Sequence, residues 1–170
     1  MNSPTANQTP LWPADETLRV VLDTNVVMAF WHFCDPKLMS LWDWLAARNT
    51  VVLTRRECLE ELERVLAYRQ FEIAPDKQAT ILAEYRARAE CLPDATEEQM
   101  LAAAALPRCK DRDDQKFIQL AWESGAHLLL TRDKMLLALN RRPIYRDKLN
   151  IVKPERLIKA LVEAGELQAV

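Results

Sequence analysis

The stretch Arg19-Val20-Val21-Leu22-Asp23-Thr24-Asn25 decides the fold prediction. Its apolar residues form one continuous run with two β-branched valines, and the run ends abruptly at a carboxylate, a hydroxyl and an amide. A short, continuous run of this kind is typical of a buried strand in a parallel sheet that is covered on both faces. Because open parallel sheets bind ligands at the carboxyl edge of their strands, Asp23 is a candidate functional residue.

The chain has 170 residues, which is enough for one domain with a proper core. Its 23 basic and 25 acidic residues give a net charge of -2, which points to neither nucleic acid nor membrane. The charge is unevenly distributed, because residues 108–159 carry 13 Lys and Arg against 7 Asp and Glu. This local excess permits a phosphate-binding face. Residues 1–17 are polar and contain three prolines, so we expect a flexible tail before a single domain over residues 18–170.

Several classes of protein are excluded by composition. The four cysteines are far apart and only two histidines occur, so no zinc ligand set is expected and the thiols indicate a reduced, cytoplasmic protein. No signal peptide and no membrane-spanning apolar run is apparent. With only two glycines, the chain also lacks the glycine-rich loops of P-loop and dinucleotide-binding proteins.

Three further apolar runs predict buried strands at residues 50–53, 127–130 and 151–152. Helical patterns separate them, at residues 26–33, 37–48, 56–67, 75–91, 115–124 and 134–139 and after Pro154. Strands alternating with helices imply right-handed crossovers. We therefore predict a three-layer α/β/α sandwich with a central parallel sheet of four or five strands.

Two acidic residues follow predicted strands directly: Asp23, and Asp133 three residues after Leu130. If these strands are neighbours, both carboxylates emerge at one edge of the sheet. A divalent cation is the usual compensation for carboxylates held close together, and hard oxygen ligands favour Mg²⁺ or Mn²⁺. Each acid has an alternative role as a helix N-cap.

Other acids could join this site. Asp114 shares the apolar side of its helix with Phe117 and Ile118, so we assign it to chemistry. Asp111, three residues earlier, is assigned to the helix cap, with a supporting role at the site left open. On the helix over residues 56–67, Glu61 and Glu63 flank the apolar face on opposite borders, and helical geometry does not choose between them.

These motifs, in this order, resemble those of the PIN-domain nucleases, above all the single-domain toxin subunits of bacterial toxin–antitoxin pairs. The resemblance covers about residues 19–155 and rests on Val20 to Asn25, Glu61-Leu62, Asp114 with Phe117-Ile118, and Leu130 to Asp133. It implies an α/β/α sandwich, an acidic pocket for Mg²⁺ or Mn²⁺, hydrolysis of RNA phosphodiester bonds, and an antitoxin partner. Carried over residue by residue, it selects Glu61 over Glu63 and gives the pocket acids as Asp23, Glu61, Asp114 and Asp133, with Asn25 and Thr131 as polar neighbours.

On this reading, Asp23, Asp114 and Asp133 are the expected metal ligands, direct or through water, while Glu61 orients water at the site. RNA is expected to cross the basic side of the molecule, using Arg55, Lys110, Arg112, Arg132 and Arg141, with the cluster of Arg141, Arg142, Arg146 and Lys148 as the strongest candidate.

The aromatic stretch that includes Trp31 and Trp44 is hard to bury completely in a small domain. It predicts a homodimer interface or a surface for an antitoxin helix.

Two alternatives remain. An aspartate-nucleophile phosphotransferase normally has a second acid two residues after the first, and Asn25 stands there instead. A non-catalytic RNA- or protein-binding member of the same fold would be marked by a broken acid set, whereas this chain retains all four acids.

Overall fold

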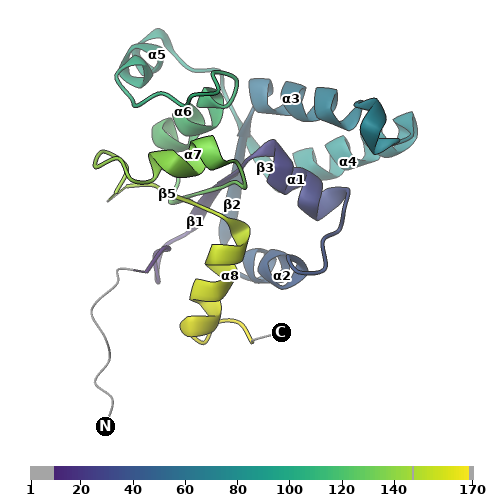
Figure 1. Cartoon of the computed structure of the whole chain (residues 1–170), viewed down its shortest axis with the longest axis horizontal. Helices are drawn as coiled ribbons and strands as arrows, with labels where there is room; N and C mark the ends of the chain where they lie inside the picture. Colours follow the sequence, from purple (N-terminus) through teal and green to yellow (C-terminus); the bar gives the residue numbers. More distant parts are fainter. Residues whose placement is uncertain (1–9, 147, 169–170) are drawn as a thin grey trace.

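The computed structural model describes residues 10–146 and 148–168. Its centre is a sheet of five parallel strands in the order β3-β2-β1-β4-β5 (Figure 1). The strands are β1 (Leu18–Leu22), β2 (Thr50–Arg55), β3 (Ala89–Leu92), β4 (Leu128–Leu130) and β5 (Asn150–Val152). The predicted parallel α/β sandwich is confirmed.

Helices cover both faces of the sheet because successive side chains of β1 point to opposite sides. Val20 and Leu22 pack into one core and Val21 into the other. The first core is closed by α1 (Thr24–Trp31), α2 (Met39–Ala47), α3 (Arg56–Leu66), α4 (Pro75–Arg88) and α8 (Pro154–Glu163). The second core is closed mainly by α6 (Gln115–Glu123) and α7 (Lys134–Leu139), and Figure 1 shows these two on the opposite side of the sheet from α1 and α2.

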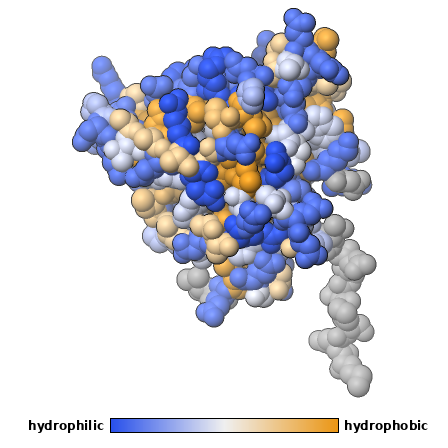
Figure 2. Space-filling model, turned by 180° about the vertical axis from the view of Figure 1, so that it is seen from behind, coloured by the Kyte–Doolittle hydropathy of each residue, from blue (hydrophilic) through white to orange (hydrophobic). Residues whose placement is uncertain are grey.

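Two smaller helices lie outside these layers. The short 3-10 helix η1 (Arg69–Phe71) joins α3 to α4, and α5 (Glu97–Ala104) buries none of its residues. Apolar side chains reach the surface in places, as the rear view in Figure 2 shows. Among the large apolar side chains of the described residues, Leu101 on α5 is the most exposed. Within the described residues, no helix combines the length and apolar character needed to cross a bilayer.

The ends of β1 and β4 lie side by side, which is the condition under which the sequence brings Asp23 and Asp133 to one edge. Leu22 pairs with Leu130, and the Asp23 N–H donates to the Leu130 carbonyl over 3.0 Å. Asp23 is then the N-cap residue of α1, and Asp133 is the N-cap residue of α7. The carboxyl edge of the sheet thus gathers the residues that follow both strands.

The fold differs from expectation at the edge of the sheet. The helix predicted over residues 75–91 ends at Arg88, and Ala89–Leu92 form the edge strand β3 instead. Two of these four residues, Glu90 and Cys91, are exposed, so the strand has no buried apolar run to reveal it. Pairing with β2, in the register Val52 to Ala89, ends the helix there.

The expected N-terminal tail is described only in part, because residues 1–9 lie outside the described residues. In the remainder, Trp12 is buried in the first core, and its Nε1 donates to Glu166 over 3.1 Å. The division of the chain at residue 17 stays a prediction.

Candidate active site

Asp23 is the most deeply buried acid at the carboxyl edge of the sheet, with a relative exposure of 3%. The hydroxyl of Thr131 donates to Asp23 Oδ2 over 2.7 Å, and Thr131 itself is completely buried. The same hydroxyl oxygen accepts the Asp133 backbone N–H over 2.9 Å. One threonine therefore ties the end of β4 to the carboxylate that follows β1.

Glu61 reaches the same place from α3. The hydroxyl of Thr24 donates to Glu61 Oε1 over 2.7 Å, and the ammonium group of Lys116 forms an ion pair with Oε2. Glu63, the alternative on the opposite border of the apolar face, is exposed. The structure thus brings Glu61, and not Glu63, to the pocket.

Asp114 is the N-cap residue of α6, but its side chain makes no capping hydrogen bond. The expected cap by Asp111 is wrong: Asp111 Oδ1 accepts the Asp113 N–H over 3.0 Å, within a turn that precedes the helix. An aspartate side chain often accepts the backbone N–H group two residues later in this way. The helix therefore begins after the turn, at Gln115. Asp111 is exposed and Asp114 half-buried, so Asp114 is the acid of this loop that faces the pocket.

Asp23, Glu61 and Asp114 each place one carboxylate oxygen within 4.8 Å of the others. Among the described residues this is the only such group of three or more potential ligands, and Asp133 is not part of it. Asp133 Oδ1 instead accepts the backbone N–H groups of Met135 and Leu136, over 2.7 and 3.1 Å, and caps α7. Three of the four expected acids therefore meet, and the fourth stands beside them as a helix cap.

Burial and nearby charges raise the pKa values of Asp23 and Asp114. Burial raises the pKa of Asp23 to about 6, against the hydrogen bond from Thr131, and the charges of Glu61 and Asp133 add to the increase. Burial also raises the pKa of Asp114 to about 7, together with repulsion from Asp23, Asp111, Asp133 and Glu61. A cation bound beside these two carboxylates would stabilise their ionised form.

The donor set fits Mg²⁺ or Mn²⁺. Three carboxylates offer hard oxygen ligands, and no cysteine or histidine belongs to the group. A site of this composition does not favour zinc, for which nitrogen and sulfur ligands are usual.

The expected substrate-binding arginines have different surroundings. Arg132 is held by Asp35 and Glu155, over 3.0 and 2.6 Å. Arg55 is buried in an ion pair with Glu123 at 2.8 Å, which leaves it no exposed face for a phosphate. In contrast, the remaining candidates are exposed: Lys110, Arg112, Arg141, Arg142, Arg146 and Lys148, together with the polar neighbour Asn25.

Sequence reasoning missed two residues of this site, Thr24 and Lys116. Thr24 directly follows Asp23, and as the first residue of α1 it turns its hydroxyl toward Glu61. Lys116 lies two residues after Asp114 in the first turn of α6. A lysine near paired acids is the only signal in the sequence, and it does not say which acid the lysine pairs with.

The comparisons with known proteins agree with this fold. A family model described as a PIN domain matches residues 19–135. A solved structure of VapBC2 from Rickettsia felis, bound to a DNA fragment from their promoter, is similar at 15% identity and a TM-score of 0.60, over 80% of this chain and 98% of that one. PAE2754 from Pyrobaculum aerophilum is similar at 17% identity and a TM-score of 0.55, over 85% of this chain and 96% of that one.

A search of the curated proteins gives no match. The two structural neighbours share the fold, and the family model covers most of the chain, including Asp23, Glu61 and Asp114. This chain belongs to the PIN-domain family.

Proposed function

We propose that this protein is an endoribonuclease that uses Mg²⁺ or Mn²⁺ to hydrolyse RNA phosphodiester bonds. We further propose that it is the toxin of a type II toxin–antitoxin pair and acts in the cytoplasm. The observation that carries the proposal is the meeting of Asp23, Glu61 and Asp114 at the carboxyl edge of a PIN-domain sheet. The similarity to the Rickettsia felis VapBC2 structure supports the toxin–antitoxin part.

Each residue of the pocket has a part in this reaction. A divalent cation supplies Lewis-acid activation of water and neutralises the charge of the phosphate when it is bound. Asp23 and Asp114 are the residues that would hold it, with Asp133 contributing negative charge from its position as a cap. Thr131 fixes the orientation of the Asp23 carboxylate, and Thr24 fixes that of Glu61.

RNA would approach over the basic residues that follow α7. Arg141 and Arg142 are exposed, as is Arg112 before α6, so all three can contact phosphates. Arg132 contributes less directly, because Asp35 and Glu155 neutralise its charge. Each exposed contact that is removed should weaken binding similarly for all RNA sequences.

We place the partner surface at an aromatic cluster beyond the end of α1, formed by Phe33, Tyr68 and Phe71. Trp31 and Trp44 are only half-buried, but Trp31 packs on Trp42 and Tyr85, and Trp44 Nε1 donates to Glu166 over 2.8 Å. Phe33 and Tyr68 are more available, at 58% and 50% exposed, and both rings pack against Phe71. An antitoxin segment or a second copy of the chain would bury this cluster.

A non-catalytic RNA- or protein-binding role is the second candidate. The observation in its favour is that Lys116 already compensates part of the acidic charge within the protein. Against it, Asp114 has no capping hydrogen bond, so its half-buried carboxylate is not explained by a structural role at the helix.

A cleavage assay tests the proposal. The full chain is incubated with labelled single-stranded RNA, or with DNA of the same sequence, in Mn²⁺ or in EDTA. We expect cleavage only of the RNA and only in Mn²⁺. We expect the Asp23→Asn variant to lose this cleavage. Cleavage that persists in EDTA, or in Asp23→Asn, would contradict the assignment of the pocket.

A further inference from the structure

Lys116 is a cation inside the acidic pocket. Its side chain is 12% exposed and that of Glu61 is 15% exposed, so the ion pair between them is largely withdrawn from water. The ammonium group also donates to the backbone carbonyl of Asp113 and lies 5.2 Å from the centre of the Phe117 ring. A buried lysine needs such partners, because removing its charge from water is costly.

The carboxylate of Glu61 has more bonding partners than the carboxylates of the other two acids. Thr24 occupies Oε1 of Glu61 and Lys116 occupies Oε2, so both oxygens already have donors. Asp23 has one oxygen bonded to Thr131, and the side chain of Asp114 caps no helix N–H. The three carboxylates are therefore unequal as metal ligands, although all three lie within reach of one another.

We propose that Lys116 is the resident counter-ion of Glu61 and competes with a divalent cation for this carboxylate. Lys116 thereby lowers the affinity of the site for the cation and leaves Asp23 and Asp114 as the principal ligands. It is a positioning residue, because it acts through Glu61. This inference rests on the proposed function, since it concerns the same metal site.

The size of the effect follows from electrostatics. Two unit charges at ion-pair distance interact strongly enough, even near a protein surface, to change a binding constant by about tenfold or more. Removing the Lys116 charge should therefore strengthen binding of a divalent cation by about tenfold. Most of this gain should disappear when Glu61 can no longer carry its own charge.

The test is a calorimetric titration of the metal-free full chain with Mn²⁺, at one pH and ionic strength. We expect Lys116→Met to bind Mn²⁺ about tenfold more tightly than the wild type. Lys116→Arg keeps the positive charge and should bind as the wild type does. If Lys116→Met does not fold, Lys116→Gln removes the same charge with a polar side chain.

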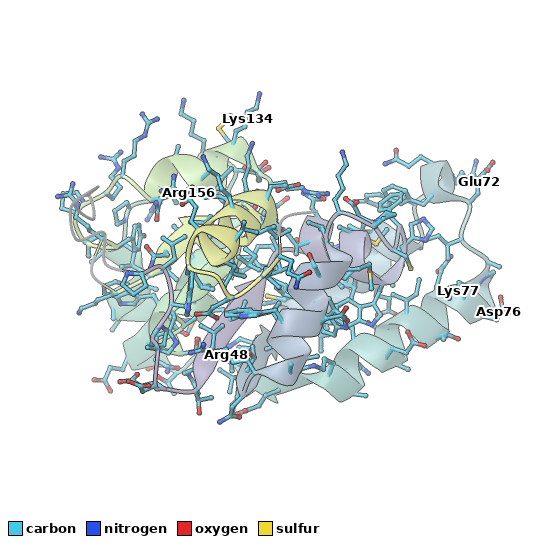
Figure 3. The ribbon with its side chains drawn as sticks, turned by 90° about the horizontal axis from the view of Figure 1, so that it is seen from below. Arg48, Glu72, Asp76, Lys77, Lys134 and Arg156 are labelled. Carbon is cyan, nitrogen blue, oxygen red and sulfur yellow. The ribbon has the colours of Figure 1, made fainter. Side chains whose placement is uncertain are left out.

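Lys77→Met is the matched control for the loss of one positive charge. Lys77 is exposed on α4, and Figure 3 shows it with Glu72 and Asp76 at one end of the molecule, well separated from Lys134, the first residue of α7. We expect this variant to leave the Mn²⁺ affinity within twofold of the wild type.

The decisive comparison adds Glu61→Gln. The tenfold gain from Lys116→Met should fall to less than threefold in the Glu61→Gln background. An unchanged or weaker affinity in Lys116→Met, or an equal gain with and without Glu61, would overturn the role of Lys116 while the wild type still binds Mn²⁺. If neither the wild type nor Lys116→Met binds Mn²⁺, both this inference and the proposed function fail.

Discussion

The hydroxyl of Thr131, at the end of β4, donates to the carboxylate of Asp23, at the end of β1, over 2.7 Å between two buried side chains. This bond joins residues 108 positions apart and orients the first acid of the pocket. Because Thr131 also accepts the Asp133 N–H, its one hydroxyl links two acids.

Thr131→Val should therefore be costly. It removes the donor to a buried carboxylate and the acceptor for a backbone N–H, so we expect a loss on the order of 2 kcal/mol in the free energy of unfolding at neutral pH. Urea denaturation measures this loss. The matched control is Thr50→Val, since the Thr50 hydroxyl is buried without a hydrogen-bond partner among the described residues, and it should be neutral or stabilising. Equal effects of the two variants would contradict the role of the Thr131 bond.

The raised pKa values of Asp23 and Asp114 make the stability of the metal-free protein depend on pH. Between pH 4 and about 7 the folded protein keeps protons on these carboxyls, at pKa values of about 6 and about 7, while the unfolded chain has lost them. The folded state then binds more protons, so the free energy of unfolding falls as the pH rises through this window. For Asp23 alone the fall is on the order of 3 kcal/mol and is nearly complete about one pH unit above its pKa.

Urea denaturation in EDTA, from pH 4.5 to 7.5, measures this dependence. Asp114→Asn removes one of the two titrating groups, so its stability should fall less with pH than that of the wild type. Mn²⁺ in place of EDTA should oppose this fall in the free energy of unfolding of the wild type, by about 2.7 kcal/mol at a hundredfold excess over the dissociation constant. Parallel pH profiles for wild type and variant would show that Asp114 has an ordinary pKa.

Asp133 has two roles that separate by substitution. Asp133→Ala loses the cap of α7 and should cost about 1 kcal/mol, because two backbone N–H groups lose their acceptor. Asp133→Asn keeps an acceptor oxygen while removing a charge that repels Asp23 and Asp114, so the stability of the metal-free protein should be unchanged or higher. Thermal unfolding in EDTA distinguishes the two variants. Because both variants remove the charge, the difference between them measures the cap, and a clear loss of stability in Asp133→Asn would contradict the charge repulsion inferred here.

The aromatic cluster of Phe33, Tyr68 and Phe71 predicts self-association or antitoxin binding. Replacing Phe33 and Tyr68 by serine should weaken association at least tenfold, as judged by sedimentation of the chain alone and with the proposed antitoxin. Leu101→Ser is the control, because Leu101 is 75% exposed on α5, away from the cluster. Equal association of all three proteins would remove the cluster from the interface.

The sequence predicts most of the sheet because its strands are buried on both faces. The run Val20 to Leu22 and the run Leu128 to Leu130 are continuous, and both are almost fully buried. The edge strand β3 escapes prediction because pairing with β2, rather than burial of its own side chains, determines it.

The acids are predictable to a similar extent. Asp23 and Asp114 follow from their places after a strand and before an apolar helix, and both lie in the pocket. The ion pair between Glu61 and Lys116 joins α3 to α6, and no local pattern encodes such a contact. The predicted cap by Asp111 is wrong because its turn with Asp113 competes locally with a helix cap.

The acidic pocket is tested most directly by comparing the rates of Mn²⁺-dependent RNA cleavage by the wild type, Asp114→Asn and Asp111→Asn. Circular dichroism confirms that each variant is folded. We expect the wild type and Asp111→Asn to cleave at rates within about fivefold of each other, because Asp111 is exposed and engaged in its own turn. Asp114→Asn should lose at least about a hundredfold in rate, since it removes a pocket carboxylate. Full activity of Asp114→Asn, with loss of activity in Asp111→Asn, would contradict the pocket described here.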